Sequence, residues 1–230
     1  GQAQTNARFV FFSPFPNLVP SGVTFEACMD SSDDFVCQSG GQGGTMTFYG
    51  APANTYISLE LSAPPFATSL YNYYLHAVDT PNQVFDYWAN VLEEELVAQV
   101  RAESGVALSP GHGSVWATLM TRVGDQALPG ITDTRVEING SADGAFCVIS
   151  SAAGDLLPMA EALGAGLSCE HIVFFNVPEG EHNLAVFETS DGALLPRVCT
   201  PLAAWASYGG HVATIEVEEG VITRPILACE

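Results

Sequence analysis

Phe174-Phe175-Asn176-Val177-Pro178-Glu179-Gly180 is the stretch of sequence that decides the fold. A short apolar run leads into Asn, Pro and Gly, which favour turns, and an alternating pattern follows at residues 183–187. An imperfect copy stands earlier in the chain, as Phe48-Tyr49-Gly50-Ala51-Pro52-Ala53-Asn54. Each copy predicts a strand, a turn and a second strand, and the pair predicts two β-sandwich modules in one chain.

The composition bounds both the fold and the partners. The chain has 230 residues, of which 47% are hydrophobic, so it can bury a core and is not disordered. It has 26 acidic residues against six Arg and no Lys, which gives a net charge of −20. Nucleic acids and anionic membrane surfaces would repel such a chain. The charge is compatible with a solvated acidic exterior or with cation binding.

We predict a mainly β chain with two β-sandwich modules, at residues 1–79 and 106–230. An amphipathic helix is predicted to connect them over residues 80–105. Thr80 would be its N-cap, Gln83 would complete a capping box, and apolar residues recur at helical spacing up to Val100. A stripe of this width must be buried against a sheet or a partner.

The cysteines indicate an oxidising compartment. Their number is even, and none of them lies in a CxxC pair or has a His at zinc-ligand spacing. Six cysteines allow 15 pairings, and six buried free thiols are the alternative. We favour disulfides between neighbours in the sequence, since each would close a short loop within one module. These pairs are Cys28–Cys37, Cys147–Cys169 and Cys199–Cys229.

The N-terminal strand could serve assembly. Arg8-Phe9-Val10-Phe11-Phe12 is an apolar, β-rich run that precedes the first repeat. It could complete a neighbour's sheet by strand addition at an open edge. The alternative is a strand that pairs within its own module. The opening residues carry no Met and no basic region, as expected of a mature chain whose signal peptide has been removed.

Several runs of the second half share the pattern of one family of β-sandwich domains. They are Gly113-Ser114-Val115-Trp116, Ala127-Leu128-Pro129-Gly130, Val136-Glu137-Ile138, the stretch 174–180 and Leu184-Ala185-Val186. With these runs the second half resembles the carboxypeptidase regulatory-like (transthyretin-like) domain family. The first half resembles it less, through residues 20–23 and the copy at 48–54. The resemblance implies an Ig-like or transthyretin-like sandwich of seven or eight strands that usually lacks catalytic residues and serves as an accessory, adhesive or folding module.

Metal binding has two candidate sites. Asp30, Asp33 and Asp34 lie in a predicted loop that could supply oxygen ligands to calcium, although their spacing does not fit an EF-hand. His171 and His182 flank the central turn and could approach each other if their strands pair. Otherwise we expect no cofactor.

The function that we expect is that of a secreted, non-catalytic structural or interaction protein at the cell surface. It would self-associate into a fibre or surface layer, or bind another surface protein. A carbohydrate-binding or adhesion module is the first alternative, because exposed aromatic rings can stack on sugar rings. A metal-dependent enzyme is the second. No apolar run is long enough for a membrane helix. The aromatic candidates for a glycan platform are Tyr71, Tyr73 and Tyr74, or Trp116 and Trp205.

Overall fold

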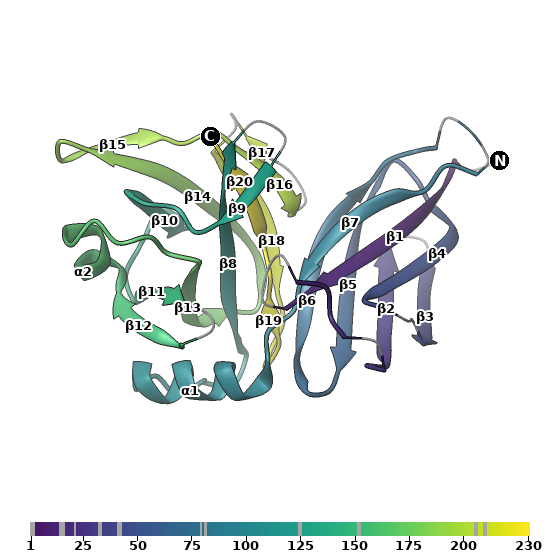
Figure 1. The fold of residues 1–230 in the computed structure, drawn as a ribbon, viewed down its shortest axis with the longest axis horizontal. Helices are drawn as coiled ribbons and strands as arrows, with labels where there is room; N and C mark the ends of the chain where they lie inside the picture. Colours follow the sequence, from purple (N-terminus) through teal and green to yellow (C-terminus); the bar gives the residue numbers. More distant parts are fainter. Residues whose placement is uncertain are drawn as a thin grey trace.

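The described part of the chain is mainly β and forms three sheets and two helices (Figure 1). Neither helix has the length and apolar character that crossing a bilayer requires. The computed structural model describes residues 3–13, 17–20, 22–31, 34–40, 43–78, 80, 82–123, 126–150, 153–204, 207–208 and 211–230.

One large sheet of twelve strands runs through both halves of the molecule. Its main path begins in the second half, crosses through β19 and ends in the first half. The strands in this order are β12 (Asp155–Pro158), β11 (Ala145–Ser150), β13 (His171–Pro178), β8 (His112–Val123), β19 (Ile222–Thr223), β6 (Phe66–Leu75), β5 (Thr55–Ala63), β2 (Phe25–Ser31) and β3 (Asp34–Gly40). Three more strands join beside β8, namely β9 (Gln126–Pro129), β16 (Cys199–Ala203) and β20 (Ile226–Cys229).

Two smaller sheets complete the two sandwiches. The first covers the β6-β5-β2-β3 half, and the second covers the β11-β13-β8 half (Figure 1). The first contains β4 (Thr45–Pro52), β1 (Gln4–Phe12) and β7 (Phe85–Asn90), in that order. The second contains β10 (Thr134–Ile138), β14 (Gly180–Ser190), β18 (Val212–Val217) and β17 (Ser207–Tyr208), with β15 (Ala193–Pro196) beside β14.

The two smaller sheets lie on opposite faces of the large sheet. In β8, Val115 packs in the core that β14 and β18 cover, whereas Trp116 packs in a core with the helix α1 (Glu94–Ser104). Met120, on the same side of the strand as Trp116, joins the core under β1. Because alternate residues of a strand face opposite ways, α1 and the β1 sheet share one face, and the β14 sheet has the other.

The helix begins later than the sequence predicts, so its predicted N-terminal half is wrong. Residues 85–90 form β7, which pairs in parallel with β1, and α1 starts at Glu94. Tyr87 and Ala89 are buried while Asp86 faces outward, which is the two-residue period of a strand. Here helical spacing and strand alternation overlap in the sequence, and pairing with β1 decides between them. The helix ends at Gly105 as predicted, with φ of 66°.

The stretch that decides the fold is a corner where the chain changes sheets. β13 ends at Pro178 in the large sheet, and β14 begins at Gly180 in the smaller one. The earlier copy does the same between β4 and β5. Asn176 and the corresponding Gly50 have φ of 55° and 67°, and Gly180 and the corresponding Asn54 have φ of 126° and 56°, a backbone conformation that Gly and Asn tolerate better than most residues. The repeat therefore predicted two equivalent corners, one in each sandwich.

The short α2 (Met159–Gly164) follows β12, and its buried Met159 and Ala162 join the core of the second sandwich. It lies between β11 and β13 in the sequence. This segment therefore adds an edge strand and a helical turn without breaking the pairing of β11 with β13.

Candidate functional site

The three disulfides join the local pairs that the sequence favoured, Cys28–Cys37, Cys147–Cys169 and Cys199–Cys229. The first and third connect residues that stand directly opposite each other on paired antiparallel strands. The Cα–Cα distances in these two are 4.0 and 3.9 Å. Each therefore fixes the register of one strand pair, β2 with β3 and β16 with β20.

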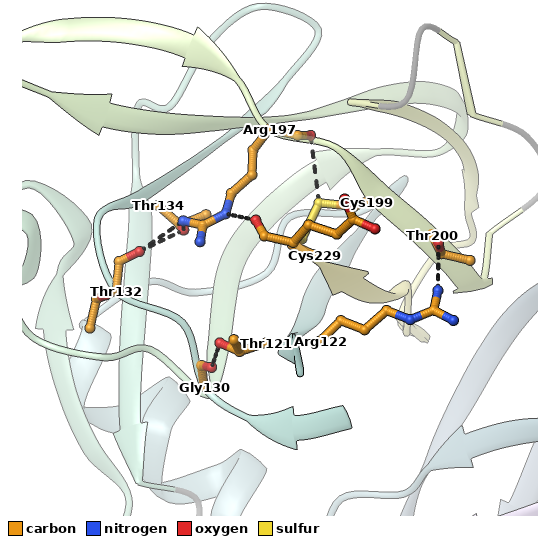
Figure 2. Close-up of a disulfide and its surroundings, with 10 residues drawn as sticks. Thr121, Arg122, Gly130, Thr132, Thr134, Arg197, Cys199, Thr200 and Cys229 are labelled. Carbon is orange, nitrogen blue, oxygen red and sulfur yellow. Dashed lines mark hydrogen bonds between the residues drawn. A yellow bond between two sulfur atoms is a disulfide. The ribbon is translucent and has the colours of Figure 1, made fainter. Parts of the chain in front are cut away.

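The C-terminal disulfide lies in a polar clasp that holds the end of the chain (Figure 2). The Arg197 guanidinium donates from Nε to the Glu230 carbonyl at 3.1 Å. It also donates from Nη1 to the Thr132 carbonyl and to Thr134 Oγ1, at 3.1 and 2.8 Å. The clasp ties the last strand to the residues that precede and begin β10, so its geometry serves stability.

The predicted assembly strand is not free. Residues 8–12 lie in β1, which pairs with β4 on one side and with β7 on the other. Phe9 and Phe11 are fully buried in the first core, and Arg8 forms an exposed ion pair with Asp86. Arg8, Phe9, Val10, Phe11 and Phe12 therefore follow the alternative, a strand that pairs within its own sandwich. Their use in assembly by strand addition stays a prediction.

The calcium candidates lie at a hairpin and not in a long loop. Asp30 belongs to β2 and Asp34 begins β3, whereas Asp33 lies outside the described residues. The predicted loop is wrong here, because residues 25–31 pair with residues 34–40. Among the residues that the structure describes, no group of three or more His, Cys, Asp or Glu could hold a metal ion. Calcium binding that uses Asp33 stays a prediction.

The two candidate histidines have separate partners. His171 Nδ1 lies 3.2 Å from Thr118 Oγ1, and burial lowers the pKa of His171 well below its usual value, with a further contribution from the charge of Arg224. His182 contacts Asn139 Nδ2 and the Pro178 carbonyl, at 2.8 and 2.7 Å. The hydrogen bonds of each ring thus have a structural role.

Most of the predicted aromatic platform is buried. Tyr71, Tyr73 and Trp116 are at most 1% exposed, so they cannot stack on a ligand, and Trp205 lies outside the described residues. Tyr74 is half-buried and takes part in a different row. Its ring centroid lies 5.0 Å from that of Tyr56, which is 46% exposed, and 5.0 Å from that of His76.

A buried arginine joins the two sandwiches, and the sequence analysis missed it. Arg224 follows β19 and is 0% exposed. It donates to Asn90 of β7 through the carbonyl (2.9 and 3.1 Å) and the side-chain oxygen (2.5 Å), and to the Trp116 carbonyl and Thr118 Oγ1 of β8. No carboxylate of the described residues forms an ion pair with it. Burial lowers its pKa to about 10, an effect that the nearby Tyr71 opposes.

Arg224 occupies the place where the core under β1 meets the core under α1. Tyr71 belongs to the first core and Trp116 to the second, and both lie beside the guanidinium. The signal in the sequence was a lone charge in the apolar run at residues 221–229. Such a charge is costly unless its donors are satisfied, and here main-chain and side-chain oxygens from both halves satisfy them.

An acidic hollow lies beside the corner at Glu179. It has a volume of about 410 Å³ and is lined by Glu179, Gly180 and residues 216–219. Burial raises the pKa of Glu218, and the charges of Glu216, Glu60, Glu179 and Asp30 raise it further. Of these four, Asp30 and Glu60 belong to the first sandwich, and Glu179 and Glu216 belong to the second. Hydrogen bonds join β18 to β5 and β6 at this point. There Glu216 accepts a hydrogen bond from Ser58 at 2.8 Å.

Comparisons with known proteins give distant similarities. No family model matches the chain, and no curated protein matches it. The chain is similar to the TIE protein of Bacillus anthracis, at 10% identity and a TM-score of 0.31, over 99% of this chain and 34% of that one. It thus spans about a third of the length of that protein.

Two further solved structures are covered almost completely. They are the minor pilin GBS52 of Streptococcus agalactiae (11% identity, 98% of this chain and 96% of that one, TM-score 0.28) and the shaft pilin SpaA of Lactobacillus rhamnosus GG (9% identity, 99% and 98%, TM-score 0.30). Identities and TM-scores at this level are too low to bear on the function of this chain.

Proposed function

We propose that the protein is a secreted, non-catalytic structural subunit of a cell-surface fibre or layer. The observation that carries this proposal is the single twelve-stranded sheet that continues from one sandwich into the other. Main-chain hydrogen bonds along such a sheet resist separation of the two halves. The buried Arg224 adds contacts to β7 and β8 at the crossing point. A rigid body of this kind suits a part that transmits force or fixes spacing.

The disulfides support the extracellular part of the proposal. All six cysteines are paired, and disulfides persist in oxidising environments. Two of the three hold a terminal or edge strand in register, β3 in one sandwich and β20 in the other. These are strands that would open first under load or thermal motion, so their covalent attachment favours a protein that must last outside the cell.

Immunogold electron microscopy of the cells that produce the protein tests this role. We expect an antibody against the folded protein to label fibres or a continuous layer at the surface, with antibody absorbed on purified protein as the control. Label that is confined to free protein in the medium would contradict the proposal. Catalytic turnover of a small substrate by the purified protein, abolished by a substitution in this chain, would also contradict the proposal.

We further propose that the second sandwich is a carboxypeptidase regulatory-like module. The support is that the strands fall where the resemblance requires them, with β8 over the first run, β10 over residues 136–138 and β13 to β14 across the corner. An experimental structure of this chain with strand order β10-β14-β18 opposite β11-β13-β8 would support the assignment, and a different order would refute it.

Glycan binding is a second candidate, which the row of Tyr56, Tyr74 and His76 favours. The Tyr56 side chain is 46% exposed and its ring contacts that of Tyr74. Aromatic rings with a polar group suit sugar rings, whose faces are apolar and whose edges carry hydroxyls. A glycan array probed with wild type, Tyr56→Ala and the control Tyr49→Ala tests this. Binding that only Tyr56→Ala abolishes would support it, and an array without hits would contradict it.

A further inference from the structure

β3 is an open edge of the twelve-stranded sheet. It pairs with β2 along its inner side, and no other described strand pairs with its outer side. It is seven residues long and contains no Pro, a residue that commonly protects edge strands. β12 and β15 are edges of four residues each, and each ends in a proline. β3 is therefore a less protected edge than these two, and it lies at the end of the molecule farthest from the second sandwich (Figure 1).

The disulfide shows which main-chain groups point outward. Cys28 and Cys37 are directly opposite each other, with Cα atoms 4.0 Å apart. That short spacing marks a pair without main-chain hydrogen bonds between its two members. The N–H and C=O of Cys37 therefore point away from β2, and by the two-residue period so do those of Phe35 and Ser39. These three residues present an unused ladder of donors and acceptors.

Side chains beside this ladder also favour contact. Phe35 is 65% exposed, and only Tyr49 exceeds it among the exposed large hydrophobic residues of the described chain. Phe35 lies on the same side of β3 as the disulfide, because positions 35 and 37 are two residues apart. Val36, on the other side, packs against the core of the first sandwich. The strand is thus anchored by one face and by its disulfide, and it does not need to refold to accept a partner.

We propose that this edge binds the same edge of a second copy of the chain, as an antiparallel pair related by a twofold axis at Cys37. In this register Cys37 faces Cys37 of the partner copy, and Phe35 faces Ser39. Each of the three outward residues then exchanges both of its main-chain hydrogen bonds. An antiparallel strand pairs with itself without leaving any group unmatched, which makes the contact self-complementary. The proposal deepens the role of structural subunit and rests on it.

The net charge of the chain makes it possible to distinguish a second copy from other partners of the β3 edge. Each copy carries a net charge of −20, so two copies repel each other at long range, and salt screens that repulsion. Self-pairing must therefore strengthen as the ionic strength rises. A basic partner strand would show the opposite dependence on salt. The sign of the salt effect thus identifies the kind of partner.

Sedimentation velocity of the purified protein tests the proposal. The concentration series should extend to about 1 mM, at ionic strengths of about 0.05 M and about 0.5 M, where the screening length falls from roughly 14 Å to roughly 4 Å. We expect a reversible dimer that is tighter at the higher ionic strength. Phe35→Glu and Ser39→Pro should each weaken the dimer at least tenfold. The outward N–H of Ser39 makes no bond to β2, so its replacement leaves that ladder intact.

Leu194→Glu is the matched control, because it places the same charge on an exposed residue of another edge strand, β15. It should dimerise like the wild type. Melting curves and circular dichroism establish that each variant is folded.

A protein that remains monomeric at every concentration and both ionic strengths overturns the proposal. A dimer that both β3 variants leave unchanged also overturns it, while the role as a surface subunit stands. If the dimer forms as expected but the antibody labels only free protein, the proposed surface role fails and the edge contact is kept. If the protein forms no dimer but binds a basic peptide in a complex that salt dissociates, the partner of the β3 edge is a basic strand and not a second copy.

Discussion

At the scale of single residues, Arg224 shows how a buried charge, whose burial costs free energy, can specify the arrangement of the two sandwiches. The guanidinium is fully buried, has no carboxylate partner among the described residues, and donates hydrogen bonds to oxygens of β7 and β8. An apolar side chain at this position would fill space but could not bond to both strands. The arginine therefore selects one arrangement of the two halves, in which Asn90 and Thr118 lie on either side of it.

Arg224→Met should lower the free energy of unfolding by about 3 kcal/mol. The substitution removes the arginine donor from the Trp116 carbonyl and Asn90 Oδ1, and a buried acceptor that loses its donor costs about 1–3 kcal/mol. The Asn90 carbonyl keeps its bond from Tyr71, and Thr118 Oγ1 keeps its contact with His171. Urea unfolding followed by tryptophan fluorescence would measure it. Arg122→Met is the control, because Arg122 is exposed, and its effect should stay within about 0.5 kcal/mol. Equal effects of the two variants would refute the role of Arg224.

His171 should make the free energy of unfolding depend on pH. Burial, with a smaller contribution from Arg224, holds the pKa of His171 well below 6.5 in the folded protein. The unfolded chain binds a proton at this residue as the pH falls through about 6.5, and the folded chain does not. Stability contributed by the neutral histidine is therefore complete above pH 6.5 and declines as the pH falls below it.

The decline should be at most about 1.4 kcal/mol per pH unit until the folded pKa is reached. Unfolding in urea at several pH values between about 4.5 and 7 measures the slope over the window in which this residue titrates. His171→Gln should reduce the slope, and His112→Gln, at the first residue of β8, should keep it. An unchanged slope in His171→Gln would contradict the assignment.

At the scale of elements, the sequence predicts corners and disulfides better than it predicts the partners of strands. The Asn and Gly residues of the two corners fix local conformation, so Asn54 and Asn176 could be placed without knowing their neighbours. β7 could not, because its apolar spacing also fits a helix and pairing with the distant β1 decides the outcome. Arg224 likewise has partners more than 100 residues away, which no local pattern reveals.

The strand β3 was not predicted from the sequence, for a similar reason. Its Asp, Ser, Gln and Gly residues are typical of a loop, and the disulfide together with pairing to β2 holds them extended. The acidic hollow was also beyond local patterns, because the β13–β14 corner and the end of β18, which line it, are distant in the sequence and are brought together by the pairing of β14 with β18. The interior position of β1 could not be told from an edge position, since both require an apolar, β-rich run.

The two cross-strand disulfides make a matched pair for measurement. Cys28–Cys37 spans 9 residues and Cys199–Cys229 spans 30, while the geometry of the strands around them is alike. If the disulfide acts by restricting the unfolded chain, the longer loop should stabilise by about 1 kcal/mol more. Double Cys→Ala variants of each pair, unfolded in urea, give the two values. A larger loss for the shorter loop would mean that edge pairing of β3, and not chain entropy, dominates.

At the scale of the whole molecule, the two sandwiches should unfold together. β19 pairs with β6 of the first half and with β8 of the second, and the Arg224 network lies next to this crossing. Differential scanning calorimetry should therefore show one transition, with calorimetric and van't Hoff enthalpies that agree. Two separate transitions in the wild type would refute the coupling. Arg224→Met should widen the transition or split it.

The two-residue strand β19 has a consequence for any attempt to divide the chain. Cutting the polypeptide between the halves would remove β6 from beside Ile222 and Thr223 and expose main-chain groups that are paired in the intact chain. It would also remove Asn90, so that the Arg224 guanidinium would lose the hydrogen bonds to this residue. Each half of the protein should be unfolded or insoluble when it is expressed alone, and refolding the two halves together should give a soluble complex.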